Sequence, residues 1–391
     1  MDRTAERIRL LPKYLFAEID KKIREAQAKG VDVIKLGIGD PDMPTPDYIV
    51  KKMQEEVARP ENQCYPPDEG VKEFREAIAD YYRQRFGVKL DPQKEVLPLL
   101  GSKEGIAHIS ACFVNPGDVN LVPDPGYPVY SIGTLFAGGA PQLMPLKRDN
   151  DFLPEFHNIP AEAARRAKLM FLNYPNNPTG AVATKEFMEE AVSYADDNNL
   201  IICHDAAYNE LAFEDYKPMS ILEVKGAKEL AIEFGSLSKT FNMTGWRIGY
   251  AVGNPLAVEA LYRFKTNIDS GLFKAIQFAG VEALTSPHTE SFIEELRTIY
   301  QGRRDVVVKA LQEAGWPLEA PKATFYVWAP VPAGFTSQEF VSYLLEETGV
   351  VVTPGRGFGK HGEGFFRIAL TVNKERMQEA MERIKNTVRY A

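Results

Sequence analysis

The lysine at position 239 stands in a segment whose residue types suit carbonyl chemistry. An apolar run ends in Ser236-Leu237-Ser238-Lys239, and Arg247 follows eight positions later. A lysine amine can form a Schiff base with an aldehyde, and two hydroxyls with a guanidinium can bind a phosphate through charge-assisted hydrogen bonds. The segment therefore suits a phosphorylated aldehyde. For the motif on its own, a surface lysine after a strand is the simpler interpretation.

Short apolar runs alternate with helix-like segments between residues 96 and 253. The predicted strands are 96–100, 120–123, 168–173, 200–204, 231–234 and 248–252, and the clearest predicted helices are 103–114 and 185–199. This alternation predicts an α/β fold with a mostly parallel sheet that helices cover on both faces. Ligands of such folds bind at the carboxyl ends of the strands, so the residues directly after each run form the candidate site.

The last hundred residues have a different pattern. A long helix is predicted over 286–314, strands over 324–329, 350–352 and 365–370, and a closing helix over 374–390. We expect a smaller α+β domain here. The N-terminal segment has too few apolar residues to fold alone, so we expect it to pack with this domain. The predicted domains are 45–285, and 1–44 together with 286–391.

Two segments that follow predicted strands suit an anion and a flat ring. Gly101-Ser102-Lys103 joins a strand to a helix, where free backbone N–H groups and the Ser102 hydroxyl would form an anion seat. A plain glycine turn with a serine cap is the alternative. Tyr127 lies in a turn-rich exit from the next strand, where its ring could cover a flat heteroaromatic ligand or simply pack in the core.

Three polar residues follow the next strands. Two prolines fix the backbone around Asn177, so its amide could point at a phenolate oxygen, although a structural turn is the alternative. Asp205 ends an apolar strand, where a carboxylate is costly unless it pairs with a cation such as a pyridinium N–H; a helix cap is the alternative. Tyr208 could bind the hydroxyl oxygen of the same ring or pack in the core.

Arg367 stands inside an apolar strand near the end of the chain. A guanidinium there needs a bidentate carboxylate, which could belong to a substrate or to an internal Asp or Glu. The neighbouring segment 357–362 matches G-x-G-x-x-G. It leads into a strand instead of a helix, so it does not predict a dinucleotide site.

Composition excludes several classes of function. The net charge of −8 argues against a nucleic-acid-binding face. No apolar stretch approaches the roughly 18 residues of a membrane span. The first residues mix charges and lack an apolar core region, so we expect no signal peptide. Three dispersed cysteines predict a reducing, cytoplasmic location. The five histidines lack metal-ligand spacing, so we expect no metal.

Taken in chain order, the motifs form one set: G-S-K, P-G-Y, N-N-P-T-G, D-x-x-Y, S-x-S-K, G-x-R-x-G and a late strand arginine. This set resembles the class I/II aminotransferases of fold type I, which use pyridoxal 5′-phosphate, over nearly the whole chain. The joint match is far more specific than any single motif, because chance would have to supply every part of one site. The resemblance implies a seven-stranded, mostly parallel sheet and a homodimer with shared active sites.

The same resemblance implies a role for each candidate residue. Lys239 would form the Schiff base and then move a proton, Asp205 would hold the ring nitrogen, and Arg367 would bind the α-carboxylate of the substrate. The other predicted contacts are Tyr127 on the ring face, Asn177 and Tyr208 at the phenolic oxygen, and Ser102, the Lys103 backbone, Ser236, Ser238, Arg247 and a neighbouring subunit's Tyr65 at the phosphate.

A narrower group within this family, the LL-diaminopimelate aminotransferases, is similar in segments 14–19, 36–42, 100–107 and 267–271. This similarity implies ping-pong transfer of an amino group from LL-2,6-diaminopimelate to 2-oxoglutarate, on a route to lysine. The distal ammonium-carboxylate end of that donor needs mixed donors and acceptors. Those expected at the substrate are Tyr14, Gly39, Lys103, Tyr65, Tyr127, Asn177 and Asn267, with Tyr65 and Asn267 from the partner and Asn267 also near the cofactor.

Two points stay open at this level. Asp68 or Glu69 is hypothesised to face the distal ammonium, because a carboxylate would complement it. The alternative function is an aminotransferase of the same fold that acts on aspartate, alanine or aromatic amino acids. A carbon–sulfur lyase and a non-enzymatic regulator of this fold are further alternatives.

Overall fold

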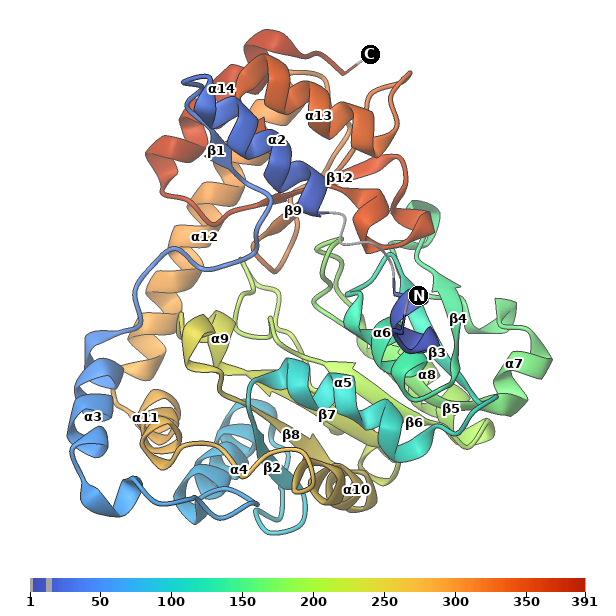
Figure 1. The fold of residues 1–391 in the computed structure, drawn as a ribbon, viewed down its shortest axis with the longest axis vertical. Helices are drawn as coiled ribbons and strands as arrows, with labels where there is room; N and C mark the ends of the chain where they lie inside the picture. Colours follow the sequence, from blue (N-terminus) through green and yellow to red (C-terminus); the bar gives the residue numbers. More distant parts are fainter. Residues whose placement is uncertain (1–2, 12–15, 391) are drawn as a thin grey trace.

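The computed structural model describes residues 3–11 and 16–390 of the chain. Its largest sheet has seven strands in the order β2-β8-β7-β6-β5-β3-β4 (Figure 1). They are β2 (Val96–Leu99), β3 (Val119–Asp124), β4 (Ala140–Pro145), β5 (Ala167–Leu172), β6 (Ile201–Asp205), β7 (Ala231–Ser236) and β8 (Gly249–Gly253). Within this sheet β8 alone runs antiparallel to its neighbours. The prediction of a mostly parallel, seven-stranded sheet is confirmed.

The edge strand β4 is the one strand of this sheet that the sequence patterns did not predict. Its sequence is Ala-Pro-Gln-Leu-Met-Pro, and prolines argue against a central strand because they cannot donate to a ladder. The structure resolves the conflict by placing β4 at the edge, where it pairs with β3 on one side. The other six strands coincide with the predicted runs to within a few residues.

A second region lies above the large sheet in Figure 1. It has a three-stranded antiparallel sheet in the order β11-β12-β9, and a short parallel pair of β1 with β10. Its elements are α2 (Phe16–Ala28), β1 (Ile34–Lys35), α12 (Thr289–Glu313), β9 (Tyr326–Pro330), α13 (Ser337–Thr348), β10 (Val350–Val351), β11 (Thr353–Pro354), β12 (Phe365–Ala369) and α14 (Lys374–Thr387). Pairing of β1 with β10 attaches the N-terminal segment to the C-terminal residues. The exact domain boundaries stay a prediction.

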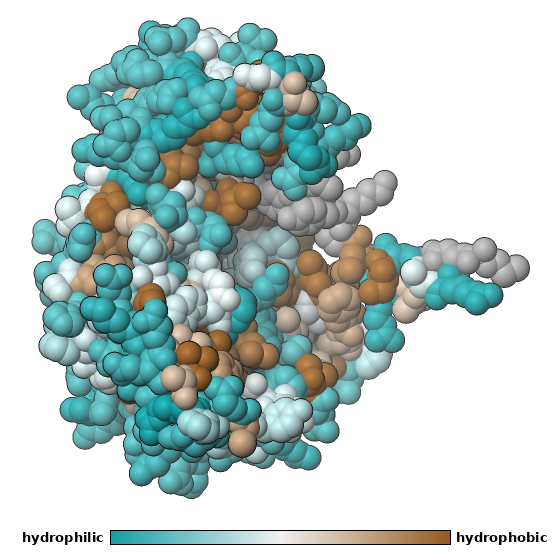
Figure 2. Space-filling view, turned by 60° about the vertical axis from the view of Figure 1, so that its left-hand side comes forward, coloured by the Kyte–Doolittle hydropathy of each residue, from teal (hydrophilic) through white to brown (hydrophobic). Residues whose placement is uncertain are grey.

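The surface is largely hydrophilic on the face shown in Figure 2, and smaller apolar groups lie in its upper part, in its lower part and toward its right-hand side. Large apolar side chains that are exposed include Ile38, Tyr65 and Ile268. Over residues 3–11 and 16–390, no helix is both long and apolar enough to cross a membrane. The same residues contain no group of three or more His, Cys, Asp or Glu side chains that could hold a metal ion.

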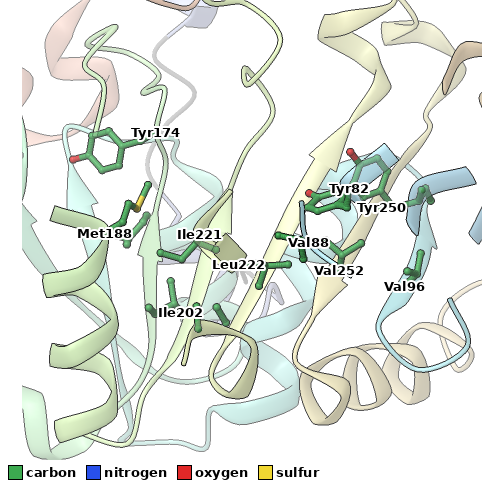
Figure 3. Packing of buried hydrophobic residues seen from close by; sticks show 14 of the residues in the cluster. Tyr82, Val88, Val96, Tyr174, Met188, Ile202, Ile221, Leu222, Tyr250 and Val252 are labelled. Atoms are coloured by element: carbon green, nitrogen blue, oxygen red, sulfur yellow. The ribbon is translucent and has the colours of Figure 1, made fainter. Parts of the chain in front are cut away.

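Successive residues of each buried strand point to opposite faces of the large sheet, so apolar runs make two cores. Phe171 and Phe234 belong to the core beneath α5, α6 and α10. Ile202, Met188 and Tyr250 belong to the core on the other face, shown in Figure 3. The helices of this region are α3 (Asp47–Val57), α4 (Lys72–Phe86), α5 (Ser102–Phe113), α6 (Val129–Phe136), α7 (Ala161–Arg166), α8 (Lys185–Asp197), α10 (Pro255–Lys265) and α11 (Lys274–Thr285). The polar residues after the strands are thereby held on a rigid base.

Candidate active site

Lys239 lies directly beyond the carboxyl end of β7, in the short helix α9 (Leu237–Thr240). The Ser236 hydroxyl caps this helix by accepting a hydrogen bond from the backbone N–H of Ser238, 3.2 Å away. The ammonium Nζ of Lys239 donates to the carbonyl oxygen of Gly39 at 2.8 Å. Burial, with Asp40 opposing it, lowers the pKa of Lys239 to about 8. More of the amine is therefore neutral and nucleophilic near neutral pH than for an ordinary lysine.

Asp205 is the last residue of the neighbouring strand β6 and is buried. Its Oδ2 accepts a hydrogen bond from the Tyr130 hydroxyl at 2.8 Å, whereas its buried Oδ1 has no hydrogen-bond partner among the described residues. Burial, opposed by the Tyr130 hydrogen bond, raises the pKa of the carboxyl to about 6. A buried carboxylate oxygen without a donor is costly, so this atom is suited to an external cationic N–H.

Arg367 projects from β12 and is also buried. Its Nη1 donates to Asn177 Oδ1 at 2.7 Å, and its Nη2 donates to the carbonyl of Gly37 at 2.8 Å. The guanidinium carbon lies 4.1 Å from the ring centroid of Tyr326 and 4.6 Å from that of Phe358. Two aromatic rings thus hold the guanidinium by stacking and cation–π attraction.

The described residues offer Arg367 no internal carboxylate, which was the alternative interpretation of this residue. Its Nε is buried without a partner, and burial lowers the pKa of the guanidinium. An unpaired buried charge is unfavourable until an anion binds. The geometry therefore fits the carboxylate of a ligand. Because Asn177 uses its oxygen to hold Arg367, its amide N–H₂ is the group left to donate elsewhere.

The anion seat forms where β2, β8 and β7 lie side by side. Gly249 of β8 is paired with Leu99 on one side and with Ser236 on the other. Gly101 has a φ of 81°, and a Cβ there would lie 2.4 Å from Nη2 of Arg247. Ser102, Arg247 and Ser236 are therefore brought around the N-terminus of α5. A Cβ at Gly249 would lie 2.6 Å from the backbone nitrogen of Ser102, so the backbone there leaves no room for a larger residue. Such a cradle suits a phosphate.

Tyr127 lies near the Asp205 carboxylate. Its ring packs edge-on against Tyr130, with the centroids 5.8 Å apart, and Tyr130 in turn binds Asp205. The exposed Lys103 places its ammonium 5.9 Å from the centroid of Tyr127. Burial raises the pKa of the Tyr127 phenol to about 12, so this ring stays neutral. A neutral ring next to a buried carboxylate is a suitable stacking surface.

Two tyrosines complete the opposite wall. The hydroxyls of Tyr208 and Tyr326 lie 3.3 Å apart, and both side chains are buried. A Cβ at position 39 would lie only 2.0 Å from Oη of Tyr326, so Gly39 must be glycine for this approach. Sequence patterns missed both Tyr130 and Tyr326. Tyr130 lies three residues after the tyrosine of the P-G-Y turn, and Tyr326 lies inside the predicted strand 324–329.

The other predicted residues are not joined to this buried group. The Tyr65 side chain is 84% exposed, and Asn267 is exposed with its amide nitrogen donating to the carbonyl of Arg263 at 2.8 Å. Asp68 and Glu69 are exposed as well. Tyr14 lies outside the described residues.

Comparisons with known proteins agree with this geometry. Residues 31–384 match the family "Aminotransferase class I and II". The chain is 58% identical to the LL-diaminopimelate aminotransferase of Moorella thermoacetica over 98% of both chains, and 57% identical to that of Desulforudis audaxviator over 97% of both. Substrate-bound BacF from Bacillus subtilis is a similar solved structure, with a TM-score of 0.94, 40% identity and coverage of 100% of this chain and 99% of that one. An aspartate aminotransferase variant from Thermus thermophilus has a TM-score of 0.93 at 28% identity, over 99% and 100% of the two chains.

The residues present fit pyridoxal phosphate at three separate points. The unpartnered Oδ1 of Asp205 suits the ring N–H, the cradle at Gly101 and Arg247 suits the phosphate, and the amine of Lys239 suits the aldehyde. These groups come from different strands, and the fold brings them to one edge of the sheet. The chain belongs to the class I and II aminotransferases, a family of enzymes that depend on pyridoxal phosphate.

Proposed function

We propose that this aminotransferase moves the amino group of LL-2,6-diaminopimelate to 2-oxoglutarate, in the synthesis of diaminopimelate and lysine. The observation that carries the proposal is Arg367, a buried guanidinium to which residues 3–11 and 16–390 offer no carboxylate, in one site with an amine of lowered pKa on Lys239. This pair fits a substrate with an α-carboxylate and an adjacent amino group. The names of relatives that are 54–58% identical support the choice of donor.

Pyridoxal phosphate, when bound, supplies a ring that accepts the electron pair released from the substrate. Lys239 would hold the aldehyde group of the cofactor through its amine, and as a neutral amine it could also move a proton. Asp205 would keep the ring nitrogen protonated through a charge-assisted hydrogen bond, and Tyr130 fixes the orientation of that carboxylate. Arg367 holds the substrate carboxylate, with Asn177 bound to its Nη1.

The phosphate is held, in this proposal, by Ser102, the Lys103 backbone, Ser236, Ser238 and Arg247. Tyr127 covers the ring face. The Tyr208 hydroxyl and the Asn177 amide would each donate a hydrogen bond to the phenolic oxygen. The support for these roles is their position at the carboxyl edge of the sheet around Lys239 and Asp205.

We further propose a homodimer in which Tyr65 and Asn267 complete the site of the partner. Tyr65 is 84% exposed, and the apolar side chains of Ile38 and Ile268 are 60% and 59% exposed. Large apolar groups in this state commonly mark a protein–protein contact.

The proposal also includes the domain bounds, the compartment and the distal part of the donor site. Residues 45–285 form the large domain, and residues 1–44 with 286–391 form the small one. Cys64, Cys112 and Cys203 are free, which supports a reducing compartment such as the cytoplasm. Tyr14, Gly39 and Lys103 belong to the distal part of the donor site, with Asp68 or Glu69 facing the distal ammonium.

A spectrum tests the cofactor and the donor together. The absorbance of the purified protein is recorded before and after addition of LL-diaminopimelate, without a keto acid. Loss of the aldehyde-derived band and growth of the amine-derived band is the expected result. Aspartate, alanine and an aromatic amino acid serve as comparison donors. A change with one of these and none with LL-diaminopimelate would contradict the proposed donor and leave the aminotransferase chemistry intact.

A further inference from the structure

A buried lysine outside the reacting group lies beneath the anion seat. Lys265 is the last residue of α10, and its side chain is 1% exposed. Its Nζ lies 2.6 and 2.7 Å from the two carboxylate oxygens of Asp269 and 3.7 Å from Oε1 of Glu104. Burial of an ammonium is unfavourable unless carboxylates pair with it. This cluster is therefore a specific internal contact, and none of the proposed catalytic roles uses it.

The Glu104 side of the cluster leads to the anion seat. Oε2 of Glu104 accepts a hydrogen bond from the backbone N–H of Leu100 at 2.7 Å. Leu100 directly precedes Gly101, and its carbonyl oxygen lies 3.5 Å from Nη2 of Arg247. One carboxylate thus holds the backbone from which the seat is built, while its other oxygen faces Lys265.

The Asp269 side leads to the loop that carries Asn267. The carbonyl of Lys265 accepts hydrogen bonds from the N–H groups of Ile268 at 2.8 Å and Asp269 at 3.0 Å. Oδ1 of Asp269 accepts from the N–H of Gly271 at 2.7 Å. The loop is therefore folded around Lys265 through both its backbone and its ammonium.

This loop also touches the segment that carries Tyr65. Gly271 has a φ of 85°, and a Cβ there would lie 2.8 Å from Cγ of Pro66. Pro66 directly follows Tyr65 in the chain. Both of the exposed residues assigned to the partner's site are thereby connected to the loop that Lys265 holds.

We propose that Lys265 is a positioning residue that fixes the anion seat of its own subunit and the Asn267 and Tyr65 segments in one arrangement. Removing its charge would leave the carboxylates of Glu104 and Asp269 without the cation between them, and like charges repel. Leu100 and the loop at 266–271 would then move apart. The second half of this inference rests on the proposed homodimer, because Asn267 and Tyr65 serve a site only across that contact.

Cofactor binding tests the first half without any turnover. In a Lys239→Ala background the affinity for pyridoxal phosphate reports the seat and the ring contacts, since no covalent bond forms. Lys265→Met is expected to raise the Kd about tenfold or more, and Lys265→Arg to recover most of the affinity, because a buried charged contact is restored. A Kd within twofold of the Lys265-intact background would overturn this half.

A matched control separates positioning from general loss of stability. Arg304 is a second buried cation, 3% exposed, and it pairs with Glu214 and Asp305. Arg304→Met is expected to lower the free energy of unfolding while leaving the cofactor Kd unchanged. If Lys265→Met does not fold, Glu104→Gln replaces it; this variant keeps the shape of the side chain, and an unchanged Kd in it likewise contradicts the inference.

Hybrid dimers test the second half. A hybrid of one Lys239→Ala subunit with one Lys239-intact subunit has a single working site. Lys265→Met in the intact subunit is expected to weaken cofactor binding at that site. The same change in the Lys239→Ala subunit is expected to raise the KM for the amino donor severalfold at saturating cofactor, through Asn267 and Tyr65.

An effect from the intact subunit alone would overturn the link to the partner's site. Failure of the unsubstituted protein to dimerise or to transfer amino groups would instead contradict the proposed function. The Kd measurement on Lys265→Met would still decide the role of Lys265 at its own seat.

Discussion

The candidate residues form an inner, buried set and an outer, exposed set, and the contacts within one chain position only the inner set. Lys239, Asp205 and Arg367 lie in the interior, each with contacts that fix its orientation. Tyr65 and Asn267 lie on exposed loops with no contact to those three among the described residues. The difference teaches that one fold positions Lys239, Asp205 and Arg367 by itself, whereas Tyr65 and Asn267, which are assigned to the cofactor and donor of the partner's site, need a second surface.

The largest expected effect comes from replacing Lys239, the central residue of the inner set. Lys239→Ala removes both the covalent attachment and the proton carrier, so we expect turnover to fall by at least about 10⁴-fold. Cofactor binding should persist, because Asp205 and the anion seat are untouched. Steady-state kinetics and dialysis of the bound cofactor check the two halves. Turnover near that of the unsubstituted protein would rule out the proposed mechanism.

The next effect concerns stability and pH. The pKa of Asp205 is about 6 in the folded chain, above its ordinary value, so the folded state binds more protons between pH 4 and 6. Stability of the cofactor-free protein therefore falls as pH rises through this range, by about 3 kcal/mol from this carboxyl alone.

Asp205→Asn removes that titration. Relative to the unsubstituted cofactor-free protein, the variant should gain stability between pH 4 and 7, with urea unfolding at both pH values as the measurement. An equal pH dependence in the two proteins would show that Asp205 is not a buried carboxyl with a raised pKa. With cofactor bound, the same substitution should cost activity, because the ring nitrogen loses its anionic partner.

Arg367→Lys sharpens the comparison from the substrate side of the inner set. The substitution keeps the charge but loses the planar fork between Tyr326 and Phe358. We expect kcat/KM for the amino donor to fall by about 10- to 100-fold, since one charge-assisted, bidentate contact is lost. Cofactor affinity should change little. A large loss of cofactor with unchanged KM would assign Arg367 to the cofactor instead.

The sequence predicted the inner set better than the outer one for physical reasons. Apolar runs that end in a single polar residue, as at Asp205 and Ser236, locate strand ends that the parallel sheet then brings together. Tyr326 and Tyr130 were missed because an aromatic residue in an apolar strand or helix is usually packing. The strand β4 was missed because its prolines suit an edge, and edges are decided by the whole sheet.

Exposed loops carry no such signal, because neither periodicity nor burial constrains them, and the partner's surface decides what they touch.

The smallest predicted effect comes from changes in these exposed loops. Asp68→Asn and Glu69→Gln should each raise the KM for LL-diaminopimelate by only a few fold, since an ion pair near solvent contributes at most about 1 kcal/mol. The matched comparison is a donor without a distal ammonium, whose KM should stay the same.

This last pair of variants decides whether the outer loops select the donor through charge. Burial raises the pKa of the Tyr262 phenol, and the negative charges of Glu69 and Asp68 raise it further. Both carboxylates therefore act on this ring. A loss confined to the diamino donor in one variant would identify the carboxylate that faces the distal ammonium. An unchanged KM in both variants would contradict the hypothesis that Asp68 or Glu69 binds the distal ammonium. The exposed loops would then select the donor through their shape alone.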